Sequence, residues 1–152
     1  MPETPEQNGM AERANRTIVE MARCLLLDAK LPKTYWLRAI ATACHLRNLV
    51  VTESGGLTLF ESCTGRKPHI EKLKVFGCTV VVQKRKNLRQ KLDKKASKCK
   101  FLGYDEHRPG YVVQDMSTGK VFVARNVIFN EKGVPSFKTV EEIDFADFDD
   151  SS

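Results

Sequence analysis

The sequence predicts an α+β protein in which a helical first half is followed by a small β-barrel. In the first half, apolar side chains recur at the three- and four-residue spacing that is typical of helices. After about residue 75, the apolar residues instead form short runs that are rich in β-branched and aromatic side chains. Five such runs within about 60 residues indicate a small barrel.

The first helix is expected to cover about residues 9–29. Pro5 stiffens the approach, and Asn8-Gly9 has the chemistry of a turn, so we predict that Asn8 caps the helix. One side of the helix carries apolar residues at core spacing: Ala11, Ala14, Ile18, Ala22, Leu25, Leu26 and Ala29.

A second helix is expected over about Lys33–Leu49, because Lys30-Leu31-Pro32 breaks the first one. Apolar residues occur on almost all sides of it, which indicates packing on more than one side. We expect any uncovered part of this surface to act as a homo-oligomer contact rather than as a cofactor pocket.

Thr58-Leu59-Phe60-Glu61 has the pattern of a capping box and predicts a short third helix that stops at Gly65. The basic stretch Gly65-Arg66-Lys67-Pro68 is the predicted domain boundary. We therefore divide the chain into a helical part over residues 1–68, a barrel over residues 69–131 and an acidic tail over residues 132–152. The tail is expected to be disordered and could cover a basic surface or bind another protein.

The barrel strands are expected where the apolar runs fall. Gly77 and Gly103 lie inside two of these runs and are natural positions for bulges or corners. The runs are Val75–Val82, Cys99–Tyr104, Tyr111–Val113, Val121–Ala124 and Val127–Phe129.

The charge of the chain is unevenly distributed. The net charge is +6, but residues 131–152 hold seven acids and two bases, so residues 1–130 carry +11. The densest basic segment lies between the first two expected strands and contains one acid, Asp93. Its nine bases are Lys84, Arg85, Lys86, Arg89, Lys91, Lys94, Lys95, Lys98 and Lys100.

This basic segment has two interpretations, which the residues alone do not separate. It could be a solvated loop, or it could contact nucleic-acid phosphates and release counterions, which gives non-specific, salt-sensitive DNA binding. Few aromatic residues interleave with the bases, so we expect contacts to the phosphate backbone rather than base stacking. Arg13, Arg16 and Arg23 of the first helix would extend the basic surface.

The composition argues against several other classes of protein. No apolar run is as long as a membrane span, and no leader opens the chain, so we expect an intracellular protein with no membrane partner. Five widely spaced cysteines without a Cys-x-x-Cys favour buried, reduced thiols over a disulfide framework or a zinc site. The three histidines have no ligand spacing with them.

Glu12 is the candidate catalytic residue. It shares one helical face with Arg16 and Glu20, so it should lie exposed in the first turn. Spacing alone favours a surface carboxylate that pairs with Arg16. The alternative is a metal ligand in a phosphoryl-transfer site, which needs further acids because a single carboxylate cannot hold two divalent ions.

Residues 4–16, Thr-Pro-Glu-Gln-Asn-Gly-Met-Ala-Glu-Arg-Ala-Asn-Arg, resemble the segment around the last acid of the Asp-Asp-Glu triad in copia-type retrotransposon integrases. The resemblance covers about residues 4–131. It implies that Glu12 is the catalytic, metal-binding glutamate, that residues 1–68 are the helical end of an RNase H-like catalytic core, and that an SH3-like barrel follows. Further matching stretches are Leu31–Trp36, Phe60–Pro68, Leu73–Cys78, Cys99–Tyr104 and Val127–Glu131.

The sequence departs from the family in one important respect. In the family, both catalytic aspartates precede the glutamate, but only eleven residues precede Glu12 here and none is aspartate. We therefore expect a nuclear, DNA-binding piece of an integrase that does not catalyse strand transfer alone and binds no metal tightly. The parent enzyme would use Mg²⁺, and the missing half of the core would be a partner. The alternative is a host-retained, non-catalytic module that binds nucleic acid or another protein.

Overall fold

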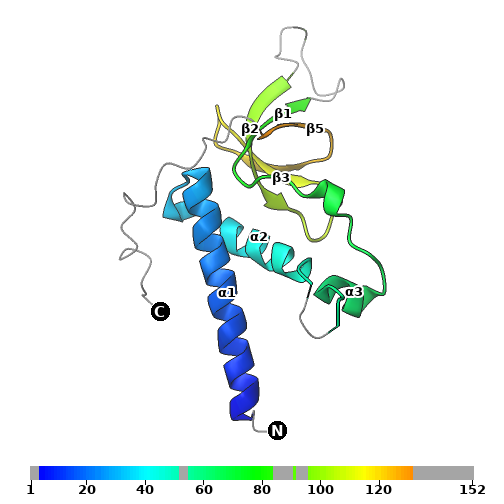
Figure 1. Ribbon diagram of the computed structural model, residues 1–152. Helices are drawn as coiled ribbons and strands as arrows, with labels where there is room; N and C mark the ends of the chain where they lie inside the picture. Colours follow the sequence, from blue (N-terminus) through cyan, green and yellow to red (C-terminus); the bar gives the residue numbers. More distant parts are fainter. Residues whose placement is uncertain (1–3, 52–54, 84–90, 92–95, 132–152) are drawn as a thin grey trace.

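The computed structural model describes residues 4–51, 55–83, 91 and 96–131, which form three α-helices, two 3₁₀ turns and a five-stranded sheet. The helices lie together at one side of the sheet (Figure 1). This arrangement confirms the predicted α+β class. The acidic tail and the bases Lys84, Arg85, Lys86, Arg89, Lys94 and Lys95 lie outside the described residues.

Helix α1, Pro5–Ala29, begins earlier than predicted. Its N-cap is Thr4, whose backbone N–H donates to Oε1 of Gln7 at 3.1 Å. Pro5 follows at the first helical position, where a backbone N–H is not needed. The prediction that Asn8 is the cap is wrong, because the Asn8 N–H already donates to the Thr4 carbonyl within the helix. The reciprocal Thr4–Gln7 cap outweighs the turn preference of Asn8-Gly9.

Helix α2, Trp36–Asn48, follows the 3₁₀ turn η1, Lys33–Tyr35, close to the predicted limits. It packs mainly against α1 on one side and against strand β2 of the sheet on another. Ala39 and Ala43 are fully buried, which allows the neighbouring backbones to approach closely. The prediction that this helix packs on more than one side is confirmed.

Helix α3, Leu59–Thr64, has the predicted capping box. The Glu61 N–H donates to Oγ1 of Thr58 at 3.0 Å, and the Thr58 N–H donates to Oε2 of Glu61 at 2.9 Å. Gly65 ends the helix in the left-handed conformation, as expected for a residue without a Cβ. A second 3₁₀ turn, η2, covers Ile70–Lys72 and leads toward the sheet.

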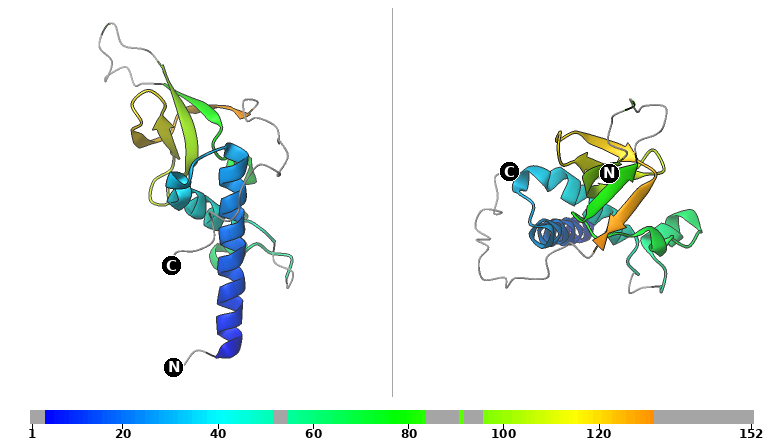
Figure 2. Two further views of the ribbon diagram at one scale, coloured as in Figure 1. Left: turned by 90° about the vertical axis from the view of Figure 1, so that its left-hand side faces the viewer. Right: turned by 90° about the horizontal axis from the view of Figure 1, so that it is seen from above.

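The sheet is antiparallel, with the strand order β4-β3-β2-β1-β5. Viewed from above, its strands curve around a common interior (Figure 2). Phe101 is fully buried there and makes edge-on contacts with the rings of Tyr111 and Phe129. The strands are β1 Thr79–Gln83, β2 Ala96–Tyr104, β3 Tyr111–Asp115, β4 Val121–Ala124 and β5 Val127–Asn130.

The outer face of the sheet forms a second core with the helices. Leu102 of β2 and Val112 of β3 pack there with Ala22 and Leu26 of α1. The hydroxyl of Tyr35, beside α2, donates to Oε1 of Gln114 on β3 at 2.6 Å. Helices and sheet are therefore joined by a continuous apolar contact and a hydrogen bond, while the domain boundary at residues 65–68 stays a prediction.

Two glycines permit this close approach. A Cβ at Gly77 would collide with the Cβ of Ala29, and a Cβ at Gly103 would lie 2.6 Å from Oγ1 of Thr42. The register of β2 against β3 shifts between Phe101 and Gly103, so the predicted bulge at Gly103 is confirmed. Gly77, with φ +79°, lies in a turn before β1 rather than inside a strand. This turn explains why β1 starts at Thr79 and not at Val75.

Candidate functional site

Glu12, Arg13 and Arg16 lie on the first half of α1, and all three side chains are exposed. Glu12 is the eighth residue of the helix, about two turns from its start, so its predicted place in the first turn is wrong. This half of the helix projects away from the sheet in both side views (Figures 1 and 2). Glu12 is therefore open to a partner that approaches from outside.

The residues that the structure describes do not complete a metal site around Glu12. Among them, no three His, Cys, Asp or Glu side chains gather closely enough to hold a metal ion. Two magnesium ions need several acidic oxygens in near-octahedral geometry, and one carboxylate cannot provide them. The described residues therefore do not fit a two-metal site without further acids.

Arg23 lies on the second half of α1 and is half-buried, between the buried residues Ala22 and Leu26 of the helix–sheet core. Arg13 and Arg16 precede Ile18, the first α1 residue that packs against this core. Because a helix rises about 1.5 Å per residue, Arg13 lies about 15 Å from Arg23 along the axis. The three arginines thus differ in exposure, and their contribution to one basic surface stays a prediction.

Lys98 and Lys100 both lie within β2, because this strand starts at Ala96 and not at Cys99 as expected. They alternate with Cys99 and Phe101, which are fully buried in the barrel interior, so both lysines point to the outer face of the sheet. Their Cα atoms are about 7 Å apart, because a strand rises about 3.4 Å per residue. Lys91, in the connection between β1 and β2, is exposed.

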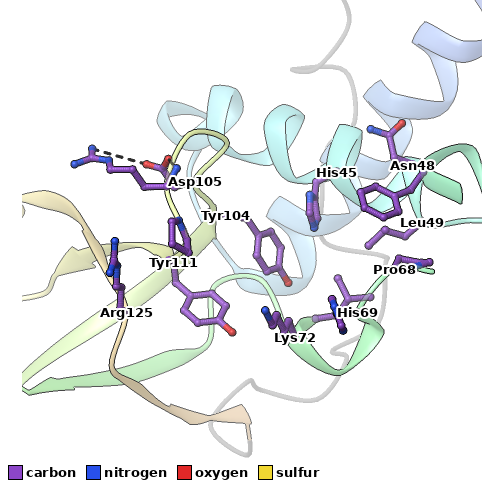
Figure 3. A pocket seen from close by; sticks show the side chains of 15 residues that line it. His45, Asn48, Leu49, Pro68, His69, Lys72, Tyr104, Asp105, Tyr111 and Arg125 are labelled. Atoms are coloured by element: carbon purple, nitrogen blue, oxygen red, sulfur yellow. Dashed lines mark hydrogen bonds and ion pairs between the residues drawn. The ribbon is translucent and has the colours of Figure 1, made fainter. Parts of the chain in front are cut away.

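A cleft of about 520 Å³ lies where α2, α3 and the segment after α3 face the barrel. Figure 3 shows the rings of His45, Tyr104 and Tyr111 along its wall, with Lys72 and Arg125 at its edge. The cleft also holds Arg108, together with a single acid, Asp105. It therefore combines aromatic faces with an excess of positive charge.

The aromatic wall of the cleft is partly stacked already. The rings of His45 and Tyr104 lie 4.4 Å apart, centroid to centroid, at an angle of 24°. The Tyr104 hydroxyl accepts a hydrogen bond from the Lys74 N–H at 2.9 Å, which fixes the ring. Burial lowers the pKa of His45, although the charge of Glu106 opposes this shift. His45 is accordingly a neutral ring at pH 7.

The Asp105 carboxylate forms its hydrogen bonds within its own loop. Its Oδ1 accepts hydrogen bonds from the backbone N–H groups of His107 and Arg108, both at 2.8 Å. These hydrogen bonds, together with the nearby Arg108 guanidinium, lower the pKa of the Asp105 carboxyl. The acid therefore orders the loop and offsets only part of the positive charge of the cleft.

The sequence interpretation missed this cleft. Its lining comes from α2, α3, residues 68–73, the end of β2, the loop that follows and the turn at Arg125. No linear spacing links these segments. The only sequence signal was the pair of aromatic residues Tyr104 and Tyr111, which flank a turn containing Arg108-Pro109-Gly110.

Two further properties concern the thiols and the helices. Cys78 and Cys99 are buried in the barrel interior, and burial raises the pKa of Cys78 to about 11, so its thiol is unreactive at neutral pH. The prediction of buried thiols is wrong for Cys24 and Cys63, which are exposed on α1 and α3, because the described residues do not cover either helix on that side. No helix within the described ranges is both long enough and apolar enough to cross a membrane.

The sequence is similar to a known domain family and to known polyproteins. Residues 78–143 match the family described as the retroviral polymerase SH3-like domain. The chain is 41% identical over 135 residues to the retrovirus-related Pol polyprotein from transposon RE2 of Arabidopsis thaliana, covering 88% of this chain and 9% of that protein. It is 40% identical over 143 residues to the corresponding polyprotein from transposon TNT 1-94 of Nicotiana tabacum, covering 93% and 11%.

A third relative, the Pol polyprotein from transposon RE1 of Arabidopsis thaliana, is 39% identical over 135 residues. The chain thus spans about a tenth of the length of the curated relatives it matches. The resemblance to copia-type Pol polyproteins is confirmed. The chain contains a retroviral polymerase SH3-like domain and, over most of its length, is similar to a short segment of copia-type retrotransposon Pol polyproteins.

Proposed function

We propose that this chain is an integrase-related region that binds duplex DNA without sequence preference through the outer face of β2. The observation that carries the proposal is the placement of Lys98 and Lys100. Both lie on the face of β2 opposite the buried residues Cys99 and Phe101; Lys98 is exposed and Lys100 is half-buried, and we infer that their ammonium groups reach a phosphate backbone from this face. In the sequence, the remaining bases of the basic segment come directly before this strand.

Phosphate contacts of this type have a measurable signature. Each phosphate that a lysine neutralises releases condensed counterions, so affinity falls linearly on a logarithmic salt scale with a slope of about −0.9 per contact. Lysine provides a point charge rather than a planar fork, which suits backbone contact more than base readout. A DNA-binding role also supports our proposal of a nuclear location.

The test is a salt titration of the affinity for a duplex of about 20 base pairs. The variant Lys98→Gln/Lys100→Gln should lower the salt slope by about 2, because two contacts are removed. The double variant Arg66→Gln/Lys67→Gln removes the same charge from the exposed stretch after α3 and should leave the slope unchanged. If the chain does not retard duplex DNA at low salt, the proposal fails and a protein-interaction module becomes the better explanation.

We further propose that the parent polyprotein performs metal-dependent strand transfer and that Glu12 is one ligand of its Mg²⁺. The similarity to Pol polyproteins and the exposure of Glu12 on a projecting helix support this. The bound metal would stabilise the charge that develops on the phosphoryl oxygens. The other acids would come from a segment that contains two aspartates.

The same half of α1 would contact the remainder of the catalytic core or another copy of this chain. Met10 is 64% exposed there, which supports a protein contact. Joining the chain to an upstream Asp-Asp segment of a related polyprotein should give strand-transfer activity that neither piece shows alone. Absence of activity in a joined protein that folds and binds DNA would count against the proposal.

A further inference from the structure

The cleft between the helices and the barrel has a composition that differs from the β2 lysine surface. The lysine surface offers charge without rings, whereas the cleft places rings and cations around one concavity of about 520 Å³. That volume falls within the range of about 300–1,000 Å³ that is typical of small-molecule sites. The cleft is therefore large enough for a nucleotide.

Two of the rings in the cleft are stacked, and a third lies close to them at a tilt of 55°. His45 lies against Tyr104 at 4.4 Å, and Tyr111 follows with its centroid 6.0 Å from that of Tyr104. His45 remains substantially exposed on α2, so the ring that is already stacked on one side can take a second flat group on the other. Phe60 of α3, also exposed, lines the cleft as well. Base–aromatic stacking tolerates any base, because each base has a π face.

The cations at the edge of the cleft are available for an anion. Lys72 and Arg125 both line it, and no carboxylate of the described residues lies within 4 Å of either charge. Arg108 is also present but contacts Asp105 at 4.0 Å. An acidic peptide without aromatic side chains would satisfy the cations and leave the rings without a matching group. A nucleotide supplies both a planar π system and a phosphate within one unit.

We propose that this cleft binds an unpaired nucleotide of single-stranded nucleic acid, with its base against the His45–Tyr104 pair and its phosphate near Lys72 and Arg125 (Figure 3). The strand must be single because a base inside a duplex has no free face to offer. The proposal rests on the proposed nucleic-acid function but uses a different surface from the β2 lysines, so each can fail alone.

The test compares two matched double variants on two probes by fluorescence anisotropy. The probes are an oligothymidine of about ten nucleotides and a duplex of about 20 base pairs. Lys72→Gln/Arg125→Gln should weaken oligothymidine binding at least about tenfold and change duplex binding less than about twofold. Lys98→Gln/Lys100→Gln removes the same charge and should show the opposite pattern. Equal effects of both pairs on oligothymidine would overturn the cleft proposal.

A second variant isolates stacking from charge. His45→Ala removes one exposed ring and should weaken oligothymidine binding by about fivefold or more, since stacking is lost while the cations remain. An oligomer of abasic nucleotides should bind the unaltered protein more weakly than oligothymidine. Equal binding of the abasic oligomer would show that phosphate alone is recognised and would overturn the proposal.

Two competition experiments distinguish a nucleotide from inorganic phosphate and from an acidic peptide as the ligand of the cleft. Thymidine monophosphate should compete with oligothymidine at high concentration, whereas inorganic phosphate at the same ionic strength should not. Displacement by a peptide of residues 140–152, with no His45→Ala effect on oligothymidine, would instead indicate an acidic protein ligand and overturn the proposal. Loss of duplex binding alone would refute the proposed function and leave the cleft result intact.

Discussion

The two halves of α1 differ in what holds them, although they form one continuous helix. From Ile18 to Ala29 the helix packs against α2 and the outer face of the sheet, and Ala22 and Leu26 are completely covered. From Pro5 to Thr17 it contributes to neither of the two cores that the described residues form. Stability and proposed function are therefore carried by different ends of the helix. Substitutions at the two ends should therefore act on different measurements.

The largest expected effect on stability comes from the packed end. Leu26→Ala should lower the free energy of unfolding by about 2–5 kcal/mol, because it removes a fully buried side chain and leaves a cavity. Met10→Ala on the projecting end should change it by less than about 0.5 kcal/mol. Urea unfolding followed by circular dichroism measures both, and equal losses would show that the projecting end is also packed.

The contact between the end of α1 and the sheet should be nearly as sensitive. Gly77→Ala places a Cβ against Ala29 at a φ of +79° and should cost about 2–4 kcal/mol. Gly119→Ala has almost the same φ, +73°, but nothing lies within 4 Å of the new Cβ, so it should cost about 1 kcal/mol. Similar melting temperatures for the two variants would contradict the close approach of Gly77 to Ala29.

A smaller effect is expected from the hydrogen bond between helices and sheet. Tyr35→Phe removes the hydroxyl that donates to Gln114 and should lower stability by about 1 kcal/mol. Gln114→Leu combined with Tyr35→Phe should cost less than the sum of the single changes. A double-mutant cycle measures this coupling, and strictly additive losses would show that the two side chains do not interact.

The smallest expected effect concerns the N-terminal caps of α1 and α3. The stability that the cap contributes should depend on pH in α3 but not in α1. In α3 the capping carboxylate of Glu61 accepts the Thr58 N–H, which lowers the pKa of Glu61. A lowered pKa stabilises the fold above the unfolded-state pKa, near 4.5, and this contribution is lost as the pH falls through the folded-state pKa. The equivalent acceptor in α1 is the amide of Gln7, which does not titrate.

The difference in stability between the unaltered protein and Glu61→Gln should therefore shrink as the pH falls from 6 toward 3. Gln7→Glu should create a similar pH dependence at the exposed start of α1. Chemical denaturation across this pH range tests both variants. A Glu61→Gln effect that is constant with pH would indicate that the carboxylate does not cap α3.

The sequence predicted the features that depend on neighbouring residues. The capping box at Thr58 and the bulge at Gly103 each follow from short-range chemistry, and both are present. The start of α1 was misplaced because two local signals competed over five residues, and the Thr4–Gln7 cap prevailed. The start of β2 was missed because the charge of Lys98 and Lys100 masked their strict alternation with Cys99 and Phe101.

The candidate sites were harder to predict, because they depend on contacts between distant segments. Glu12 was found through family resemblance, and its own spacing favoured an ordinary surface acid. The cleft was not found, since His45 and Tyr104 come together only when α2 packs on β2. Similarly, Arg23 is half-buried while Arg13 and Arg16 are exposed, which follows from where α1 meets the core.

The central claim is that one end of α1 carries stability and the other end carries the proposed function. The most direct test introduces Glu12→Gln into the chain joined to an upstream Asp-Asp segment. We expect strand transfer with Mg²⁺ to fall to background, while the melting temperature and the affinity for duplex DNA stay those of the unaltered joined protein. Strand transfer at the unaltered rate in the Glu12→Gln protein would contradict this claim.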